Sequence, residues 1–443
     1  MPSTKKLKFP FIKKMKINKK IKVVEKSFKI SPVSAKKLIK SFHSDMKNGL
    51  CGKKSSLKML PTYAKRPTGR EKGDFLALDL GGTNFRIFKL KLQGKRRISD
   101  ILSESFVLKK EHIANTEKEL FGFIADCIKK FMERQKFSKN KQHKIGFTFS
   151  FPIKQTAIAK GVLLGWTKGF NAKGAEGKDI VWLLNKALLG VGLSNTKIRA
   201  LANDTVSTLA AKSYEDEKCD MGVILGTGTN ACYVEKKKNE MIVNIEWGNF
   251  NKLKLTRYDK ELDENSINPG KQVLEKMVSG MYLGDIVRIV AKDLAAKGIF
   301  DVYGYKKVFD KNGVLESKHV STVESDSSKK LTKVKNVLSM LGIKRSTYSD
   351  RSILKEICRI VSLRASRLAA ILMAAVVTRM DPGLKRKHTI AIDGSVYEKH
   401  PGFSKHIRST LGDIFGRKAK NIVLSLTKDA SGKGAAILAA RQK

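Results

Sequence analysis

The stretch at residues 75–90, FLALDLGGTNFRIFKL, decides how this chain is interpreted. An apolar run typical of a strand stops at Asp79, turns through the residues GGTN at 81–84, and resumes as a second apolar run from Phe85. Glycines in such a turn let backbone N–H groups approach an anion closely, and a threonine hydroxyl adds a donor without charge. The pattern fits either a plain β-hairpin or a turn that binds phosphate.

A second stretch, residues 221–235 with the sequence MGVILGTGTNACYVE, repeats this design of strand, glycine-rich turn and strand. Neither turn is a Walker motif, since no Gly-Lys-Ser/Thr opens a helix, and neither is a dinucleotide-binding GxGxxG turn, because each continues into a strand. Two such turns facing each other would hold a triphosphate from two sides. The sequence therefore indicates a nucleotide-dependent kinase of another design.

Length and composition favour a globular protein of two or three domains, because 443 residues with 41% hydrophobic residues can bury a sizeable core. The longest apolar stretches, such as residues 369–377, fall short of the roughly 20 residues that a membrane-spanning helix needs. We therefore expect no transmembrane segment.

The charge is strongly basic, with 89 Lys and Arg against 41 Asp and Glu, or 89 − 41 = +48. Such a field attracts polyanions, acidic membranes and anionic metabolites. The basic residues are mostly lysines spread along the chain without a recognition motif, so we expect no specific nucleic-acid partner. A basic scaffold that binds polyanions stays open as an alternative.

Five cysteines are scattered without a Cys-x-x-Cys pair, which favours neither a disulfide framework nor a zinc site. A reducing, cytoplasmic compartment fits best.

Residues 1–24 contain no acidic residue and lack the apolar core of a secretory signal. We expect a disordered basic tail; the alternative is a segment that contacts an acidic membrane or organelle surface, against which Pro2 and Pro10 weigh because they interrupt a helix.

The order of predicted elements is that of an α/β protein. Residues 26–47 suit an amphipathic helix capped by Ser31, and residues 116–135 a helix with a capping box at Thr116 and Glu119. Helical patterns also cover 269–289 and 350–378, whereas strands are predicted at 75–80, 85–92, 143–153, 221–225, 231–235 and 389–393.

Seven segments stand in the order seen in hexokinases: LALDLGGTNFR, GFTFSFPIKQTAIAKGVLLGWTKGF, LANDTVSTL, GTGTNACYVE, SINPGKQVLEKMVSGMYLGDIVR, IAIDGSVYEKHPGF and SGKGAAILAA. The chain resembles a single-unit hexokinase over residues 59–440, in the superfamily shared with actin, heat-shock chaperone ATPases and sugar kinases. The resemblance implies a two-lobed actin-like (ribonuclease H-like) α/β fold. It implies ATP-dependent phosphorylation of the 6-hydroxyl of glucose and related hexoses, the first step of glycolysis, with Mg²⁺ and with a monomer or homodimer as the assembly.

The domains expected on this basis are a basic tail at 1–24, an N-terminal helical segment at 25–73 that packs on the large domain, a small domain at 74–200 completed by 430–443, and a large domain at 201–429. Sugar would bind in the cleft between the two lobes.

By the same resemblance, Asp204 is the base that accepts the proton of the 6-hydroxyl, and Lys168 and Arg86 stabilise the transferring phosphoryl group. Asp79 would hold the metal, directly or through water. The sugar-contacting set corresponds to Ser150, Thr167, Lys168, Asn203, Asp204, Asn230, Glu246, Gln272 and Glu275. The nucleotide-binding set corresponds to Asp79, Gly81, Gly82, Thr83, Asn84, Gly226, Thr227, Gly228, Asp393, Gly394, Ser395, Ser431 and Gly432.

Departures from the family pattern are few. Ala430 and Ser207 stand where glycine is usual, and Leu274 stands where an aromatic residue is common. If position 430 needs a positive φ, alanine costs about 1 kcal/mol there. A catalytically weak, sugar-sensing relative stays open as a second alternative, although the candidate catalytic residues are intact.

Overall fold

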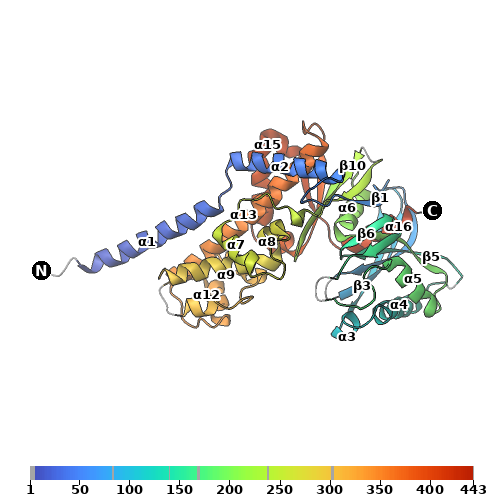
Figure 1. The fold of residues 1–443 in the computed structure, drawn as a ribbon, viewed down its shortest axis with the longest axis horizontal. Helices are drawn as coiled ribbons and strands as arrows, with labels where there is room; N and C mark the ends of the chain where they lie inside the picture. Colours follow the sequence, from blue (N-terminus) through green and yellow to red (C-terminus); the bar gives the residue numbers. More distant parts are fainter. Residues whose placement is uncertain are drawn as a thin grey trace.

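The structure is a computed structural model, and it describes residues 5–81, 84–138, 140–166, 170–236, 239–300 and 304–442. Side chains are described from residue 17 onward within these ranges, except that of Asn84. Two β-sheets organise the chain into two lobes, with the small lobe and its helices α4 and α5 at the right of Figure 1 and the large lobe around α13 at its centre.

The five-stranded sheet of the small lobe has the order β4-β3-β2-β5-β8. Its strands are β2 Lys72–Leu80, β3 Asn84–Gln93, β4 Ile98–Val107, β5 His143–Phe149 and β8 Thr196–Ala202. The six-stranded sheet of the large lobe has the order β1-β11-β10-β9-β12-β13. Its strands are β1 Leu60–Lys65, β9 Cys219–Leu225, β10 Thr229–Glu235, β11 Met241–Asn244, β12 His388–Asp393 and β13 Ile422–Leu426. A small hairpin joins β6 Ile153–Ala157 and β7 Lys160–Leu163.

The two sheets share one arrangement. In each, an antiparallel hairpin (β2–β3 and β9–β10) is flanked on one side by an antiparallel strand and on the other by two parallel strands. Each glycine-rich turn joins the two strands of its hairpin, so the repetition in sequence corresponds to a repetition in structure. The β1 strand extends the large sheet by pairing with β11, although the sequence predicts a helical segment over 25–73.

Helices cover both sheets. They are α1 Lys5–Phe28, α2 Pro32–Leu50, α3 Lys110–Ile113, α4 Glu117–Arg134, α5 Ile180–Gly190, α6 Asp204–Glu215, α7 Arg257–Glu264, α8 Val273–Val278, α9 Gly280–Ala296, α10 Tyr305–Phe309, α11 Ser317–Glu324, α12 Thr332–Met340, α13 Tyr348–Met380, α14 Ser395–Lys399, α15 Phe403–Phe415 and α16 Ala430–Ala440. Short 3₁₀ turns lie at η2 Trp247–Asn249 and η3 Gly416–Asn421.

The local signals read from the sequence are confirmed in two helices. Ser31 caps α2 by accepting from Ser34 N, with a proline in the first turn. Thr116 and Glu119 form the capping box of α4, whose buried stripe packs on the small sheet. Both caps satisfy backbone N–H groups that lack partners within the helix.

The N-terminal segment corrects an expectation, because residues from Lys5 onward are helical rather than disordered, and Pro10 lies inside the helix. The cause is tertiary packing. Ile17, Ile21, Val24 and Phe28 follow helical spacing and pack on the core of the large lobe, with Phe28 only 4% exposed. In Figure 1 the first half of α1 extends away from the body of the protein.

Helix α13 is long and apolar enough to cross a membrane by length and composition, but 89% of its most apolar window is buried inside the protein. It is the central helix of the large-lobe core, with α15, α2, α9 and the docked part of α1 packed around it.

A third core cluster joins the lobes. It contains residues of the small sheet such as Phe75 and Phe88, residues of the large sheet such as Cys232 and Ile242, and the apolar faces of α6 and α16 between them. Helix α16, at the end of the chain, therefore packs against the small sheet and against α6 together.

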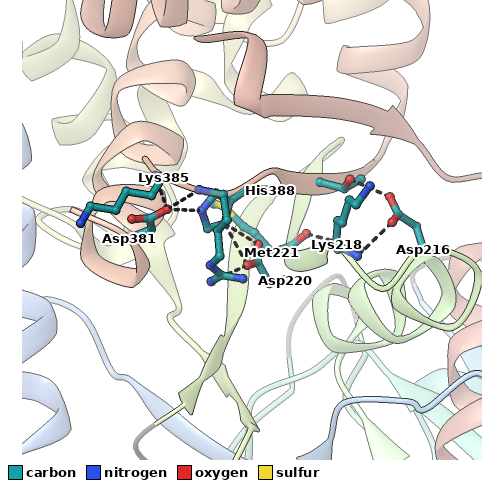
Figure 2. A network of polar contacts seen from close by, with 10 residues as sticks. Asp216, Lys218, Asp220, Met221, Asp381, Lys385 and His388 are labelled. Atoms are coloured by element: carbon teal, nitrogen blue, oxygen red, sulfur yellow. Dashed lines mark hydrogen bonds and ion pairs between the residues drawn. The ribbon is translucent and has the colours of Figure 1, made fainter. Parts of the chain in front are cut away.

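The amino ends of β9 and β12 carry a buried polar network (Figure 2). The imidazole of His388, fully buried, lies between Asp220, 2.9 Å from its Nδ1, and Asp381, 3.3 Å from its Nε2. Arg386 Nη2 lies 3.0 Å from the same Asp220 carboxylate. Each carboxylate of this network has at least one cationic or backbone N–H partner, which is what buried charges require.

Candidate active site

Asp79 is the penultimate residue of β2 and lies directly opposite Arg86 in the β2–β3 ladder. Asp79 Oδ2 accepts from Arg86 Nη2 at 2.7 Å and from Arg86 Nε at 3.1 Å, and the aspartate is only 7% exposed. Two charge-assisted hydrogen bonds to one carboxylate oxygen fix both side chains at the mouth of the first glycine-rich turn. A Cβ at Gly81, the described glycine of that turn, would meet no atom of the described residues within 4 Å.

Arg86 also reaches the other end of the chain, because its Nη1 lies 3.3 Å from Asp429 Oδ1, just before α16. Burial alone would lower the pKa of Arg86, but the negative charges of Asp79, Asp429 and Asp393 outweigh it and raise that pKa. The guanidinium is therefore surrounded by three carboxylates that come from β2, β12 and the start of α16.

Asp393 ends β12 on the large-lobe side. Burial raises the pKa of Asp393 to about 6, and the nearby charges of Asp204 and Asp79 act in the same direction while Arg86 opposes them. Among the described residues, the carboxylates Asp79 and Asp204 thus act on Asp393 against the single guanidinium of Arg86. Sites that bind metal and phosphate commonly show such perturbed carboxyl groups.

Gly394 follows Asp393 with a φ of 120°, and a Cβ there would come within 2.4 Å of the Leu225 carbonyl. Only glycine fits this position, which brings the Asp393 turn against the second glycine-rich turn at Gly226. Ser395 then begins α14. The two turns that the resemblance assigns to the nucleotide are therefore in contact.

The second glycine-rich turn is held from several sides. Gly226 O accepts from Gly280 N at 2.8 Å and Thr227 O accepts from Met281 N at 3.1 Å, so the amino end of α9 binds its carbonyls. Glu275 Oε2 accepts from Thr229 N at 2.9 Å. A Cβ at Gly228 would lie 2.8 Å from Glu275 Oε2, so a side chain there would displace the carboxylate that accepts from Thr229 N. The backbone of this turn is thus fixed before any ligand arrives.

Asp204 is the first residue of α6, and Asn203 is its cap. Both Oδ1 atoms accept from Thr205 N, at 2.9 Å from Asn203 and 2.7 Å from Asp204. A carboxylate at a helix amino end is stabilised by the helix dipole. The capping role of Asn203 and the candidate role of Asp204 as base are compatible, because each carboxylate or amide oxygen can accept more than one hydrogen bond.

Glu246 forms the centre of a polar cluster next to Asp204. Its Oε1 accepts from Asn244 Nδ2 at 2.8 Å and from Asn230 Nδ2 at 3.2 Å. Burial raises the pKa of Glu246, the positive charge of Lys58 opposes that rise, and the charge of Asp204 adds to it. Glu246 also has a φ of 56°, a left-handed conformation that is uncommon for a residue with a side chain and that surrounding contacts must hold.

A cavity of about 300 Å³ lies beside this cluster and is lined from both lobes. Asn203, Asn244 and Glu246 line it together with Lys58 and Thr62, whereas the hairpin segment 151–156 closes the small-lobe side. Its volume is in the range of pockets for small ligands, and its polar groups suit a molecule with several hydroxyls.

Of the described sugar candidates, Asn203 and Glu246 line this cavity, whereas Ser150, Asp204, Asn230, Gln272 and Glu275 are not in its lining. Ser150 follows β5, and its N–H donates to Leu80 O at 3.1 Å, beside the end of β2. Gln272 has a φ of 51° and precedes α8, which carries Glu275 to the second turn. Gly82, Thr83, Thr167 and Lys168 lie outside the described residues, and only the backbone of Asn84 is described.

The first turn of α16, which the resemblance assigns to the nucleotide, also packs against the small-lobe sheet. Ser431 and Gly432 lie in the first turn of α16, and a Cβ at Gly432 would come within 2.4 Å of the Phe88 ring. The left-handed residue is Asp429, with a φ of 52°, so Ala430 does not need the positive φ that would have made alanine costly.

Sequence reasoning missed Lys58 and Asn244. Asn244 stands two residues before Glu246, a spacing that places both side chains on one side of an extended chain, and this signal was available. Lys58 had no such signal, because it is one of many lysines and only the fold places it opposite Glu246. Among the described residues, no group of three or more His, Cys, Asp or Glu side chains is arranged to hold a metal by itself.

Comparisons with known proteins agree with this geometry. Two family models, both described as hexokinase, match residues 20–214 and 220–441. The chain is 41% identical over 421 residues to hexokinase HKDC1 of Mus musculus, covering 90% of this chain and 45% of that protein. It is 38% identical over 435 residues to hexokinase-1 of Mus musculus, covering 93% of this chain and 44% of that protein. The chain thus spans a little under half the length of these curated relatives.

Among solved structures, a hexokinase from Schistosoma mansoni in complex with glucose has a TM-score of 0.85 and 34% identity, covering 96% of this chain and 99% of that one. A second solved structure described as a hexokinase has a TM-score of 0.84 and 30% identity. The two-lobed sugar-kinase fold predicted from the sequence is confirmed by these similarities.

Proposed function

The chain belongs to the hexokinase family, and from that premise we propose that it transfers the γ-phosphoryl group of ATP to the 6-hydroxyl of glucose and related hexoses. One observation carries the proposal. Asn203, the neighbour of Asp204, lines a cavity with amide and carboxylate groups, and the charge of Asp204 acts both on Glu246 beside that cavity and on Asp393 near Asp79 and Arg86. A base between a polyol site and a phosphate site is what a sugar kinase requires.

The reaction follows from this arrangement. Asp204 accepts the proton of the 6-hydroxyl as that oxygen attacks the γ-phosphorus. The new O–P bond forms while the bond between the γ-phosphorus and the β,γ-bridging oxygen breaks, and ADP leaves with the electron pair. Arg86 and Lys168 stabilise the negative charge that spreads over the phosphoryl oxygens during transfer.

The sugar is held by groups whose hydrogen-bonding capacity matches its hydroxyls. Glu246 is already oriented by the two asparagines Asn230 and Asn244, so it meets the sugar with its free acceptor capacity in a fixed place. The full set of sugar-contacting residues that we propose is Ser150, Thr167, Lys168, Asn203, Asp204, Asn230, Glu246, Gln272 and Glu275.

ATP is assigned to the two glycine-rich turns, the Asp393–Ser395 turn and the first turn of α16. The residues present fit Mg²⁺ as well, because Asp79 supplies a buried carboxylate oxygen and Asp393 a second one nearby, and Mg²⁺ takes one or two carboxylates plus phosphate oxygens and water. When bound, the ion would neutralise charge on the phosphates. Arg86 would then exchange part of its contact with Asp79 for the transferring group.

Closure of the cleft is part of the proposal. The cavity is lined by residues of both lobes, so moving them together would exclude water, which competes with the 6-hydroxyl for the phosphoryl group.

For the basic N-terminal helix we propose a contact with an acidic membrane surface by a cytoplasmic enzyme. The first half of α1 extends from the body, and residues 5–16 contain six lysines and no acidic residue. Co-sedimentation with phosphatidylserine vesicles, but not with phosphatidylcholine vesicles, would support this contact. Equal sedimentation of the chain without residues 1–16 would contradict it.

The function is tested by ADP release coupled to an indicator reaction, with and without glucose, for the wild type and Asp204→Ala. We expect glucose-dependent release and glucose 6-phosphate from the wild type only. Turnover that survives the substitution contradicts the assignment of the base. Glucose binding without turnover in the wild type would instead favour a sugar-sensing relative, and neither binding nor turnover would leave polyanion binding as the better account.

A further inference from the structure

A chain of buried hydroxyl groups connects the helix that carries Asp204 to the small lobe. Thr148 Oγ1, on β5, lies 2.7 Å from Ser207 Oγ, on α6, and donates to Ser431 O, on α16, at 2.9 Å. Thr148 and Ser207 are completely buried and Ser431 is 8% exposed. Three elements that are far apart in sequence thus meet at one threonine.

The direction of these hydrogen bonds follows from counting protons. A threonine hydroxyl has one proton, and Thr148 uses it for the carbonyl of Ser431. Ser207 must therefore be the donor in its bond to Thr148. Removing the Thr148 hydroxyl would leave a buried O–H on α6 and reduce the bonding of a carbonyl on α16, whereas removing the Ser207 hydroxyl would leave the Thr148–Ser431 bond in place.

We call the place where β5, α6 and α16 meet at Thr148 the joint, and the backbones of these elements are in near contact there. A Cβ at Gly434 would lie 1.9 Å from Ser207 O, and a Cβ at Gly146 would lie 1.9 Å from Ala435 O. Helix α16 therefore packs so closely against α6 and β5 that a side chain larger than glycine would not fit at positions 434 and 146. The hydroxyl chain crosses this tightly packed point, so a change in it must shift backbone elements.

The joint lies next to the candidate catalytic groups on both sides. Ser207 is one turn after Asp204 on α6, and its N–H bonds to Asn203 O at 3.0 Å. Thr148 pairs with Asp79 in the ladder between β2 and β5. A shift of α6 against β5 would therefore move Asp204 relative to Asp79 and to the first turn of α16.

We propose that Thr148 and Ser207 are positioning residues, and that the chain Ser207–Thr148–Ser431 fixes the distance between the base Asp204 and the nucleotide side of the site. This inference rests on the proposed function. It also gives a role to Ser207, which stands where the family pattern usually has glycine: the hydroxyl adds a bond between the lobes that glycine cannot make.

The test measures kcat, the KM values for glucose and ATP, and the free energy of unfolding for Thr148→Val, Thr148→Ser and Ser207→Ala. Thr410→Val is the matched control, since Thr410 is buried, its hydroxyl donates to His406 O within α15, and that helix carries none of the candidate site residues. We expect Thr148→Val to lower kcat about tenfold with the KM for glucose changed less than threefold, because misplacing a base acts mainly on the transition state. Thr148→Ser should keep kcat within about twofold of the wild type, since the hydroxyl remains.

The control should lose stability and keep its kcat. An unchanged kcat in Thr148→Val, a loss in Thr410→Val as large as in Thr148→Val, or a loss in Thr148→Ser as large as in the valine variant would each overturn the inference. Should the valine variant not fold, Ser207→Ala decides: kcat about threefold lower supports the inference, and an unchanged kcat refutes it. A wild type without glucose-dependent turnover would refute the proposed function, and the inference with it, which is a different result from an active wild type with unaffected variants.

Discussion

The neighbouring strands β9 and β12 have charged groups beside their amino ends, and β12 has a charged group at its carboxyl end; the two ends differ in how those charges are balanced. At the amino ends, Asp220 and Asp381 enclose His388, and Arg386 supplies a cation (Figure 2). At the carboxyl ends, Asp393 lies among carboxylates, and burial together with those charges raises its pKa to about 6. At the amino ends the carboxylates have partners within the protein, whereas at the carboxyl end Asp393 lies close to other carboxylates.

The difference follows a general feature of α/β sheets, in which ligands bind outside the carboxyl ends of the strands. Charges that must receive a ligand cannot be fully paired by the protein itself. The comparison therefore predicts different effects for neutralising carboxylates at the two ends. Activity should be lost at the carboxyl ends, and stability should be lost at the amino ends.

The largest effect is expected for Asp79→Asn, on the small-lobe side of the site. We expect kcat/KM for ATP to fall about 10³-fold, or about 4 kcal/mol, because the variant loses the carboxylate that would hold the metal and orient Arg86. Asp74→Asn is the matched control, since Asp74 is exposed on the same strand and lies 3.9 Å from Lys141 at closest. Steady-state kinetics at several Mg²⁺ concentrations would measure it, and equal losses in both variants would contradict the role of Asp79.

The next effect is expected for Asp220→Asn, at the amino end. Removing this carboxylate leaves Arg386 and one side of the buried His388 without their anionic partner, which should cost about 3 kcal/mol of unfolding free energy. Denaturant unfolding measures the loss, with exposed Asp413→Asn as the control. A variant as stable as the wild type would show that the network in Figure 2 contributes nothing net.

A smaller effect is expected for Asp393→Asn, which should raise the unfolding free energy at pH 7.5 where Asp220→Asn lowers it. The pKa of Asp393 is raised from 3.8 to about 6, so its contribution to stability is present below pH 3.8 and is lost as the pH rises through about 6. The asparagine stays neutral, and the variant should therefore be more stable than the wild type at pH 7.5, by about 2 kcal/mol, with the difference shrinking toward pH 4. Unfolding at the two pH values tests this sign, and a variant that is less stable at pH 7.5 would remove the contrast between the two ends.

Much of this arrangement follows from sequence. The paired glycine-rich turns predict two hairpins, and both sheets contain them at equivalent places. The caps at Ser31 and Thr116 are local signals that fix helix starts, so they can be read from a few residues. The positions of the candidate site residues along these elements come from the resemblance to hexokinases.

Other features depend on contacts that no local pattern contains. Residues 269–289 read as one helix, but the chain breaks at Ser279 because the first N–H groups of α9 bind the carbonyls of the second glycine-rich turn. The basic tail reads as disordered, but it is helical from Lys5, and an apolar stripe in the second half of that helix docks on the large lobe. The link from Ser207 to Thr148 joins residues 59 positions apart, so only the fold places them together.

The most direct measurement compares Asp204→Asn with Asp220→Asn, by glucose-dependent ADP formation per folded molecule and by unfolding free energy. We predict that Asp204→Asn lowers kcat about thousandfold with little loss of stability, and that Asp220→Asn loses stability while its kcat stays within about twofold of the wild type. Glucose-dependent turnover that persists in Asp204→Asn would contradict the account.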